Sequence, residues 1–310
     1  MKRITVAGGG VLGSQIAFQA AYSGCDVTIW LRSEGSIGRT KPKLEKLRET
    51  YLQTIESMAG PDGKTAWACG IADAEGFDPA ACRARVEAAA SIRLELDLKK
   101  AVDGAELVIE SMAENAADKI AFYRQLAPLL PAQAILATNS STLLPSKLAK
   151  YTGRPEKYLA LHFANSIWKN NTAEIMAQPQ TEQAAFDAVM AFAEQIHMIA
   201  LPVRKEKSGY LLNSMLVPLL FSAMDLYVTG VSDPQSIDLA WTRGTGAPKG
   251  PFRILDTVGL TTAHNIVKQY CKIPSFLAPY HFRDIEAMLQ QYLDAGKLGM
   301  SSGEGFYTYK

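Results

Sequence analysis

The first eighteen residues constrain the fold most. They contain a short apolar run, then a glycine-rich turn, then a helical pattern. Ile4 to Ala7 have the composition of a strand, and Gly-Gly-Gly-Val-Leu-Gly follows at residues 8–13. In a βαβ unit, the glycines of a GxGxxG turn allow a tight turn and close approach to a pyrophosphate, which the helix N-terminus then binds. A ligand-free turn is the alternative, but the complete strand–turn–helix order favours a dinucleotide site. Its predicted residues are Gly8, Gly10, Val11, Leu12 and Gly13.

The rest of the chain changes character after about two thirds of its length. Short β-rich runs first alternate with helical patterns, which is typical of a parallel sheet with crossover helices. The predicted strands are residues 4–7, 27–31, 92–96, 107–111, 134–138 and 158–162, and the clearest helices are 12–23, 41–58 and 118–130. Later residues show only helical spacing, in 210–227, 237–241, 255–270 and 285–293. We predict an α/β chain with a doubly wound Rossmann-type domain (1–206) and an all-helical domain (207–310).

Composition excludes several classes of protein. The 32 Lys+Arg and 31 Asp+Glu give a net charge of +1, so no overall field attracts nucleic acid or an anionic membrane. The longest apolar run, residues 215–224, contains Pro218 and is about half of a membrane span. The 4 cysteines form no CxxC pair, which indicates neither a metal site nor a disulfide framework. We expect a globular cytoplasmic protein without nucleic-acid or membrane partners.

The position that usually distinguishes NAD from NADP has no carboxylate. An acid about 20 residues after the turn normally binds the ribose 2′-hydroxyl of NAD. Here Leu31 occupies that place and is followed by Arg32 and Ser33. A 2′-phosphate could bind these two side chains, with Arg39 within reach. The alternative is that Arg32 is a solvated charge and Glu34 binds the ribose. The cofactor is therefore NAD or NADP, and the missing acid favours NADP.

A histidine at the end of an apolar strand is the candidate acid or base. His162 closes the run 158–162 at the carboxyl edge, where doubly wound sheets bind ligands. Imidazole titrates near neutral pH and can exchange a proton with an alcohol oxygen, although a hydrogen-bonded core histidine is the alternative. Glu174 lies twelve residues later in a β-like run that could return beside it. A carboxylate there would fix the tautomer; otherwise Glu174 is a surface charge.

Short polar side chains provide further candidates. Asn139, Ser140 and Ser141 follow a buried strand at the same sheet edge as the histidine. They could hydrogen-bond the substrate oxygen and the nicotinamide ribose, though capping of the next helix is the commoner use. Asn213 lies inside an apolar helical run, where an unpaired amide is costly. It is either a substrate contact or an interhelical hydrogen bond.

These residues fall within sequence blocks shared with a known family. The chain resembles the L-3-hydroxyacyl-CoA dehydrogenases over essentially its whole length, in the blocks VAGGGVLGSQIA, LVIESMAEN, ILATNSSTL, LHFAN, SGYLLNSML, GTGAPKGPF and GEGFYTY. The combination of LHFAN, WKNNTAE and GAPKGPF is most similar to the diketoreductase branch, whose substrates need not carry CoA.

The resemblance implies an NAD(P)-dependent oxidoreductase that interconverts 3-oxo and (S)-3-hydroxy compounds by hydride transfer at C4 of the nicotinamide. It implies His162 as catalytic acid/base, Glu174 as its orienting partner, and Ser141 and Asn213 as contacts to the 3-oxygen. It places Glu114, Lys119 and Asn139 at the cofactor's ribose and nicotinamide. It also implies a homodimer formed through the helical domain, a small-molecule substrate that is a CoA thioester or a free compound, and a role in fatty acid metabolism.

Alternatives and departures from the family stay open. The chain could reduce non-CoA diketo esters or 3-hydroxy acids, or it could be a cofactor-binding structural protein without important turnover, like the lens proteins of the family. Family members commonly have proline after the asparagine of LHFAN, whereas Ser166 follows Asn165, so we expect a different loop beside the histidine. The basic residues Lys41, Lys43, Lys46 and Arg48 either contact CoA phosphates or form a solvated helix face.

Overall fold

The computed structural model describes residues 1–61 and 63–309. The chain divides into two compact units, Met1–Leu211 and Leu212–Lys310. The boundary predicted after residue 206 stays a prediction, while the division into units falls after Leu211.

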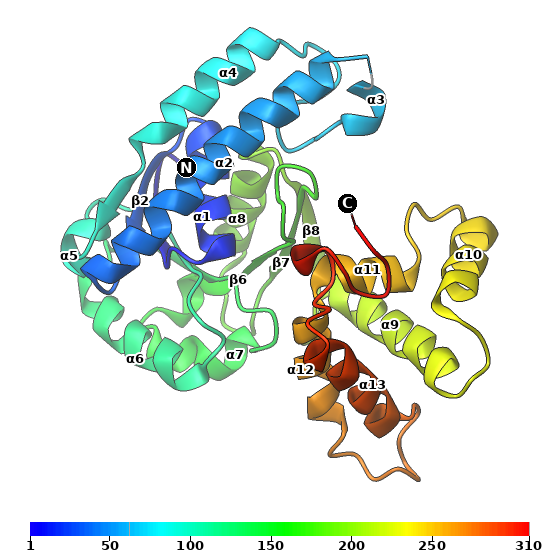
Figure 1. The fold of residues 1–310 in the computed structure, drawn as a ribbon. Coiled ribbons are helices and arrows are strands. Elements are labelled where there is room, and N and C mark those ends of the chain that lie inside the picture. Colours follow the sequence, from blue (N-terminus) through cyan, green and yellow to red (C-terminus); the bar gives the residue numbers. More distant parts are fainter. Residues whose placement is uncertain (62, 310) are drawn as a thin grey trace. The chain divides into compact units, whose positions relative to one another are not determined.

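An eight-stranded sheet forms the centre of the first unit, in the order β3-β2-β1-β4-β5-β6-β7-β8 (Figure 1). Neighbouring strands from β3 to β6 are parallel. Their order, 3-2-1-4-5-6, is that of two mononucleotide-binding halves. The predicted doubly wound Rossmann-type architecture is therefore confirmed. The strands are β1 (Arg3–Ala7), β2 (Asp26–Trp30), β3 (Arg93–Glu95), β4 (Leu107–Glu110), β5 (Ile135–Thr138), β6 (Tyr158–Phe163), β7 (Thr172–Met176) and β8 (Ile199–Val203).

Helices cover both faces of this sheet. One apolar core joins the strands to α1 (Val11–Tyr22), α2 (Glu34–Ala59), α4 (Pro79–Ala88) and α8 (Gln183–Gln195). A second core, on the opposite face, joins them to α5 (Leu98–Ala101), α6 (Ala116–Leu126) and α7 (Pro145–Leu148). Every residue of β4, β5 and β6 is buried, as expected for parallel strands covered on both sides. Between α2 and α4 lie loops and the short α3 (Gly63–Ala66), with residue 62 outside the described part.

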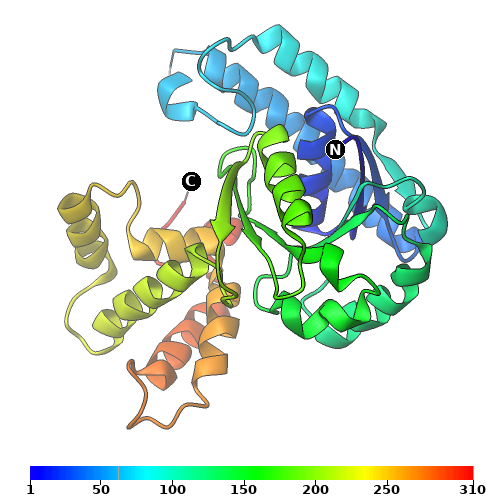
Figure 2. The same ribbon diagram turned by 180° about the vertical axis from the view of Figure 1, so that it is seen from behind.

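The sheet departs from purely parallel pairing at one edge. β7 runs antiparallel to β6, and His162 lies directly opposite Glu174 in that pair. After α8, which packs against β7 and β8 (Figure 2, light green), β8 runs parallel to β7. β8 is not predicted from the sequence, because Pro202 interrupts the usual strand pattern. Proline is tolerated there because β8 is an edge strand.

Two predicted helix boundaries are wrong. α2 begins at Glu34 instead of residue 41 and continues through Pro42, although proline usually marks a first turn. The helical region predicted over 255–270 is divided between two helices, α11 (Pro251–Val258) and α12 (Leu260–Tyr270). They are separated by Gly259, whose φ of 94° lies in the left-handed region that favours glycine.

The second unit is helical, as predicted. Its remaining helices, α9 (Leu212–Val228), α10 (Pro234–Thr245) and α13 (Phe282–Asp294), share an apolar core with α11 and α12. Asp256 of α11 is buried and accepts backbone N–H groups of Phe306 and Tyr307 at 2.9 and 3.0 Å, which fixes the C-terminal segment. Among the described helices, none combines the length and apolar composition needed to cross a membrane.

Candidate active site

The glycine-rich turn joins β1 to α1 in a conformation that other residues could not adopt. Gly8 has a φ of 121°, and a Cβ on it would meet the Ser111 carbonyl oxygen at 2.5 Å. A Cβ on Gly13 would collide with the carbonyl oxygen of Gly8. The sequence requirement for glycine at these two positions therefore comes from close packing of β1, β4 and α1.

The space beside Gly10 fits a phosphate group. No protein atom lies within 4 Å of where its Cβ would project. Gly10 is also the N-cap of α1 and provides no side-chain cap, so the first backbone N–H groups of the helix, including those of Val11 and Leu12, are not bonded by a cap. Uncapped N–H groups beside open space are what a pyrophosphate requires. These residues therefore fit a dinucleotide.

Hydroxyl and cationic groups lie close together after β2. Leu31 occupies the position where a carboxylate usually binds the ribose 2′-hydroxyl of NAD. Leu31 is buried and Arg32 is exposed. Ser33 is the N-cap of α2, and its Oγ lies 3.1 Å from Ser36 Oγ, which accepts a hydrogen bond from the Arg39 guanidinium at 3.1 Å. The first two turns of α2 thus present donors suited to a phosphate, although Glu34 also lies in the first turn.

The predicted CoA-contacting residues on α2 have different environments. Lys43 Nζ donates to the carbonyl oxygens of Gly9 at 3.2 Å and Arg39 at 2.8 Å, so it lies behind the glycine-rich turn. Arg48 forms an ion pair with Glu87 at 2.7 Å. Two of these cations are therefore bound within the protein. Lys46 is exposed.

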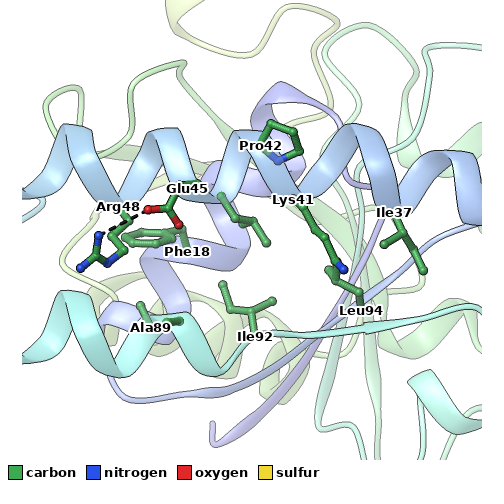
Figure 3. A pocket seen from close by; sticks show the side chains of 11 residues that line it. Phe18, Ile37, Lys41, Pro42, Glu45, Arg48, Ala89, Ile92 and Leu94 are labelled. Atoms are coloured by element: carbon green, nitrogen blue, oxygen red, sulfur yellow. Dashed lines mark hydrogen bonds and ion pairs between the residues drawn. The ribbon is translucent and has the colours of Figure 1, made fainter.

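Lys41 lies at a separate hollow of about 700 Å³ (Figure 3). Apolar side chains of α1, α2 and residues 89–94 form its lining, with Lys41, Glu45 and Arg48 among them. The lining includes neither His162 nor the glycine-rich turn, so we assign it no part in the chemistry.

The structure brings His162, Glu174 and Ser141 together. His162 Nδ1 lies 2.9 Å from Glu174 Oε2, and His162 Nε2 lies 3.2 Å from Ser141 Oγ. The histidine and the glutamate are both buried, and their contact follows from the antiparallel register of β6 and β7. A carboxylate at Nδ1 holds the proton on that nitrogen and leaves Nε2 to exchange a proton with a ligand oxygen.

Ser140 and Ser141 do not cap the next helix, so that alternative is wrong. α7 begins only at Pro145 and has no side-chain cap. The loop is instead held by Glu114 Oε1, which accepts bonds from Ser140 Oγ at 2.6 Å and from Thr142 N and Oγ1 at 2.8 Å each. Burial alone would raise the pKa of Glu114, but these hydrogen bonds and the Lys119 ammonium outweigh it and lower the pKa. Glu114 therefore fixes the loop as an anion.

Asn139 links the ends of three neighbouring strands. Its Oδ1 accepts the backbone N–H of Phe163 at 3.1 Å, and its Nδ2 donates to Ser111 Oγ at 3.3 Å. Because β4, β5 and β6 end at one edge, these contacts place Asn139 where the sequence analysis expected cofactor contacts. The contact to a cofactor stays a prediction.

Lys119 is a buried counter-ion. Its Nζ lies 2.6 Å from Glu110 Oε1, and the exposed fractions of the two side chains are 1% and 0%. The Glu110 carboxylate also accepts bonds from Met112 N, Tyr123 Oη and Thr138 Oγ1 at 2.7, 2.9 and 2.8 Å. Burial, followed by the Glu110 charge, raises the pKa of Tyr123, so the phenol stays a donor. This network joins the ends of β4 and β5 to α6. The predicted ribose contact of Lys119 stays a prediction.

Asn213 lies in the first turn of α9, in the second unit, and is half-buried. It therefore does not sit in the middle of the apolar helix, as its sequence neighbours suggested. Its contact to the substrate oxygen stays a prediction.

The loop after β6 explains the missing proline. Ser166 has a φ of 58°, and its backbone N–H donates to Gln15 Oε1 at 2.8 Å. Proline fixes φ near −65° and has no N–H, so it could not occupy this position. Gln15, which the sequence analysis did not select, thus ties α1 to the loop beside the histidine. The expected difference from the family's loop stays a prediction.

We expect Ser166→Pro to destabilise the first unit by at least about 2 kcal/mol, because it loses this hydrogen bond and forces an incompatible φ. Thermal unfolding measures the effect. Ser166→Gly is the matched control, since glycine keeps the N–H and adopts positive φ; it should unfold at or above the wild-type temperature. Equal stability of the proline variant would contradict the role given to this loop.

Tyr210, which belongs to a predicted helical run, is a further residue of the site that the sequence does not reveal. Tyr210 lies outside α9, is buried, and stacks on the His162 ring. Its position in the SGYLLNSML block carries no local signal for such a contact.

Comparison with known proteins identifies relatives along the whole chain. The family model for the NAD binding domain of 3-hydroxyacyl-CoA dehydrogenase matches residues 3–207, and the model for its C-terminal domain matches residues 209–309. The probable 3-hydroxybutyryl-CoA dehydrogenase of Bacillus subtilis (strain 168) is 30% identical over 315 residues, covering 100% of this chain and 98% of the relative. Human mitochondrial hydroxyacyl-coenzyme A dehydrogenase is 29% identical over 313 residues, with coverage of 100% and 92%. A solved structure of a diketoreductase acting on dicarbonyl compounds is 44% identical, with a TM-score of 0.85 and coverage of 100% and 99%.

Proposed function

We propose a reaction for this chain on the premise that it belongs to the 3-hydroxyacyl-CoA dehydrogenase family. It is an oxidoreductase of that type with a nicotinamide-binding domain. We propose that it interconverts 3-oxo and (S)-3-hydroxy compounds. The observation that carries the proposal is the hydrogen-bonded series from Glu174 through His162 to Ser141.

We propose that His162 transfers the proton. During reduction, His162 Nε2 gives its proton to the developing alkoxide, and Ser141 Oγ, 3.2 Å from that nitrogen, holds the same oxygen. Glu174 at Nδ1 stabilises the imidazolium before transfer and keeps the ring oriented afterwards. Asn213 is proposed as the second contact to the oxygen. The bound nicotinamide supplies or accepts the hydride at the adjoining carbon.

Residues of the first unit would hold the cofactor. The turn from Gly8 to Gly13 and the first N–H groups of α1 would bind the pyrophosphate, and Glu114, Lys119 and Asn139 are proposed for the ribose and nicotinamide. We propose NADP(H) as the preferred form. Two cations, Arg32 and Arg39, support this preference over the single carboxylate of Glu34.

We expect a higher kcat/KM with NADPH than with NADH, and about tenfold loss with NADPH alone in Arg39→Met, because a charge-assisted phosphate contact disappears. Steady-state rates with both cofactors measure this. Lys41→Met is the matched control, since Lys41 lines the hollow shown in Figure 3. A clear preference of the wild-type protein for NADH would contradict the proposal.

The substrate class has two candidates. A 3-hydroxyacyl-CoA thioester is the first, as the names of the relatives indicate. A free diketo ester or 3-hydroxy acid is the second, and two observations support it: the 44% identity to a diketoreductase, and the engagement of Lys43 and Arg48 within the protein.

A substrate panel tests the proposed function. NAD(P)H absorbance is followed with acetoacetyl-CoA, free 3-oxo acids and diketo esters, each with both cofactors. We expect turnover of acetoacetyl-CoA; turnover of the free compounds alone would select the second candidate. Absence of oxidation with every compound would contradict the proposed function and favour a cofactor-binding structural protein.

We also propose a cytoplasmic homodimer that acts in fatty acid metabolism. Exposed apolar side chains of the second unit, including Met215, Leu239 and Phe276, support a dimer formed through its helices. The four cysteines are free thiols, which is compatible with a reducing compartment. The names of the relatives refer to hydroxyacyl-CoA compounds, which is compatible with the proposed metabolic role.

A further inference from the structure

The segment that ends the first unit contacts Glu174, His162 and the two residues that flank Ser141. Three of its residues do so: Ser208, Tyr210 and Leu211. The Leu211 N–H donates to Glu174 Oε1 at 2.8 Å, on the oxygen that does not face the histidine. Ser208 Oγ donates to the Thr142 carbonyl at 3.0 Å. Between these contacts lies the side chain of Tyr210.

The ring of Tyr210 lies flat on the imidazole of His162. The two centroids are 4.5 Å apart, and the ring planes differ by 11°. Tyr210 is only 1% exposed, so its own position is set by close packing. A stacked neighbour prevents the imidazole from tilting out of the plane in which Nδ1 faces Glu174 and Nε2 faces Ser141.

The hydroxyl of Tyr210 binds the loop that carries Ser141. Its hydroxyl donates to the Ser140 carbonyl oxygen at 2.7 Å. Because Ser140 precedes Ser141 directly, this bond fixes the backbone that carries the Ser141 hydroxyl. Burial raises the pKa of Tyr210, so the hydroxyl remains a donor. One side chain therefore contacts both His162 and the backbone next to Ser141.

The backbone at Tyr210 is strained in a way that serves the same arrangement. Its φ of 51° lies in the left-handed region, which a bulky residue rarely adopts. Such strain persists only where surrounding contacts outweigh it, and it clusters at functional sites. Here it lets the ring reach His162 while the next N–H reaches Glu174.

We propose that Tyr210 is a positioning residue for proton transfer: its ring fixes the plane of His162, and its hydroxyl fixes the backbone of Ser141. This inference rests on the proposed function. It predicts separable effects, since Tyr210→Phe removes only the hydroxyl bond and Tyr210→Leu removes the stacked ring as well.

The test compares these variants with matched substitutions at Tyr22, another buried tyrosine whose hydroxyl donates to a backbone carbonyl, that of Ile71, at 3.0 Å. We expect kcat to fall about fivefold in Tyr210→Phe and about 100-fold in Tyr210→Leu, with KM for the cofactor unchanged. Tyr22→Phe and Tyr22→Leu should lower the unfolding temperature and leave kcat of the folded protein within about twofold. A kcat loss at Tyr22 equal to that at Tyr210 would overturn the proposal.

Nitrogen-15 NMR of the imidazoles gives a readout that does not need turnover. The chain has 4 histidines, and the signal missing in His162→Gln identifies His162. We expect the Nδ1-protonated tautomer to dominate in the wild-type protein and in Tyr210→Phe, and to lose population in Tyr210→Leu. An unchanged tautomer population in Tyr210→Leu would overturn the proposal. If the wild-type protein turns over no substrate, the proposed function fails, and this spectrum still decides whether Tyr210 positions the ring.

Discussion

Replacing His162 with alanine should lower kcat by about 10²- to 10⁴-fold, the usual contribution of general acid–base catalysis. Cofactor affinity should change by less than about twofold, because the proposed pyrophosphate site, the glycine-rich turn and α1, does not include β6. The Ser141 hydroxyl remains in the variant but has no partner that can deliver a proton. Initial rates from NAD(P)H absorbance give kcat, and quenching of protein fluorescence by the cofactor gives its Kd.

The matched control is His281→Ala. His281 also faces a carboxylate, with Nδ1 at 3.0 Å from Asp225, but this pair belongs to the second unit and its imidazole is 60% exposed. We expect its kcat within about twofold of wild type. Turnover retained in His162→Ala would refute the assignment of the acid/base. Loss of cofactor binding in the same variant would show that the histidine supports the fold of the site instead.

Local sequence patterns predicted those parts of the site whose structure depends on residues close together in the chain. The strand–turn–helix order at Gly8 to Gly13 depends on neighbouring residues, so spacing alone located it. The partnership of His162 with Glu174 could be expected for a similar reason, because twelve residues suffice for a strand to return antiparallel to its predecessor. The absence of an acid at Leu31 was likewise visible without coordinates.

Contacts between distant segments could not be predicted in this way. Gln15 and Ser166 are 151 residues apart in sequence, and nothing near either residue signals their hydrogen bond. Tyr210 belongs to an apolar pattern that continues into α9, and only the left-handed turn at this residue removes it from the helix. β8 contains a proline, and its place in the sheet depends on pairing with β7. Tertiary packing decides all three.

The ion pair of Glu110 and Lys119 could not be predicted from the sequence either. Its disruption should have the largest effect on the stability of the first unit. We expect Lys119→Met to destabilise the first unit by about 3–5 kcal/mol, because it leaves a buried carboxylate without its counter-ion. For a unit of this size the unfolding temperature should fall by roughly 10 °C. Tyr123, Thr138 and Met112 still donate to the carboxylate, but neutral hydrogen bonds do not cancel its charge. Thermal and urea unfolding followed by circular dichroism measure the change.

The double variant Glu110→Gln with Lys119→Met separates charge from packing. It removes both charges while Gln keeps a carbonyl acceptor for the hydroxyl donors, so it should recover at least about half of the lost stability. A double variant less stable than Lys119→Met would mean that packing around the lysine stem, and not the unpaired carboxylate, causes the loss. If Lys119→Met keeps wild-type stability but loses cofactor affinity, the ammonium contacts the cofactor as the family resemblance implies, and its ion pair with Glu110 contributes little to folding.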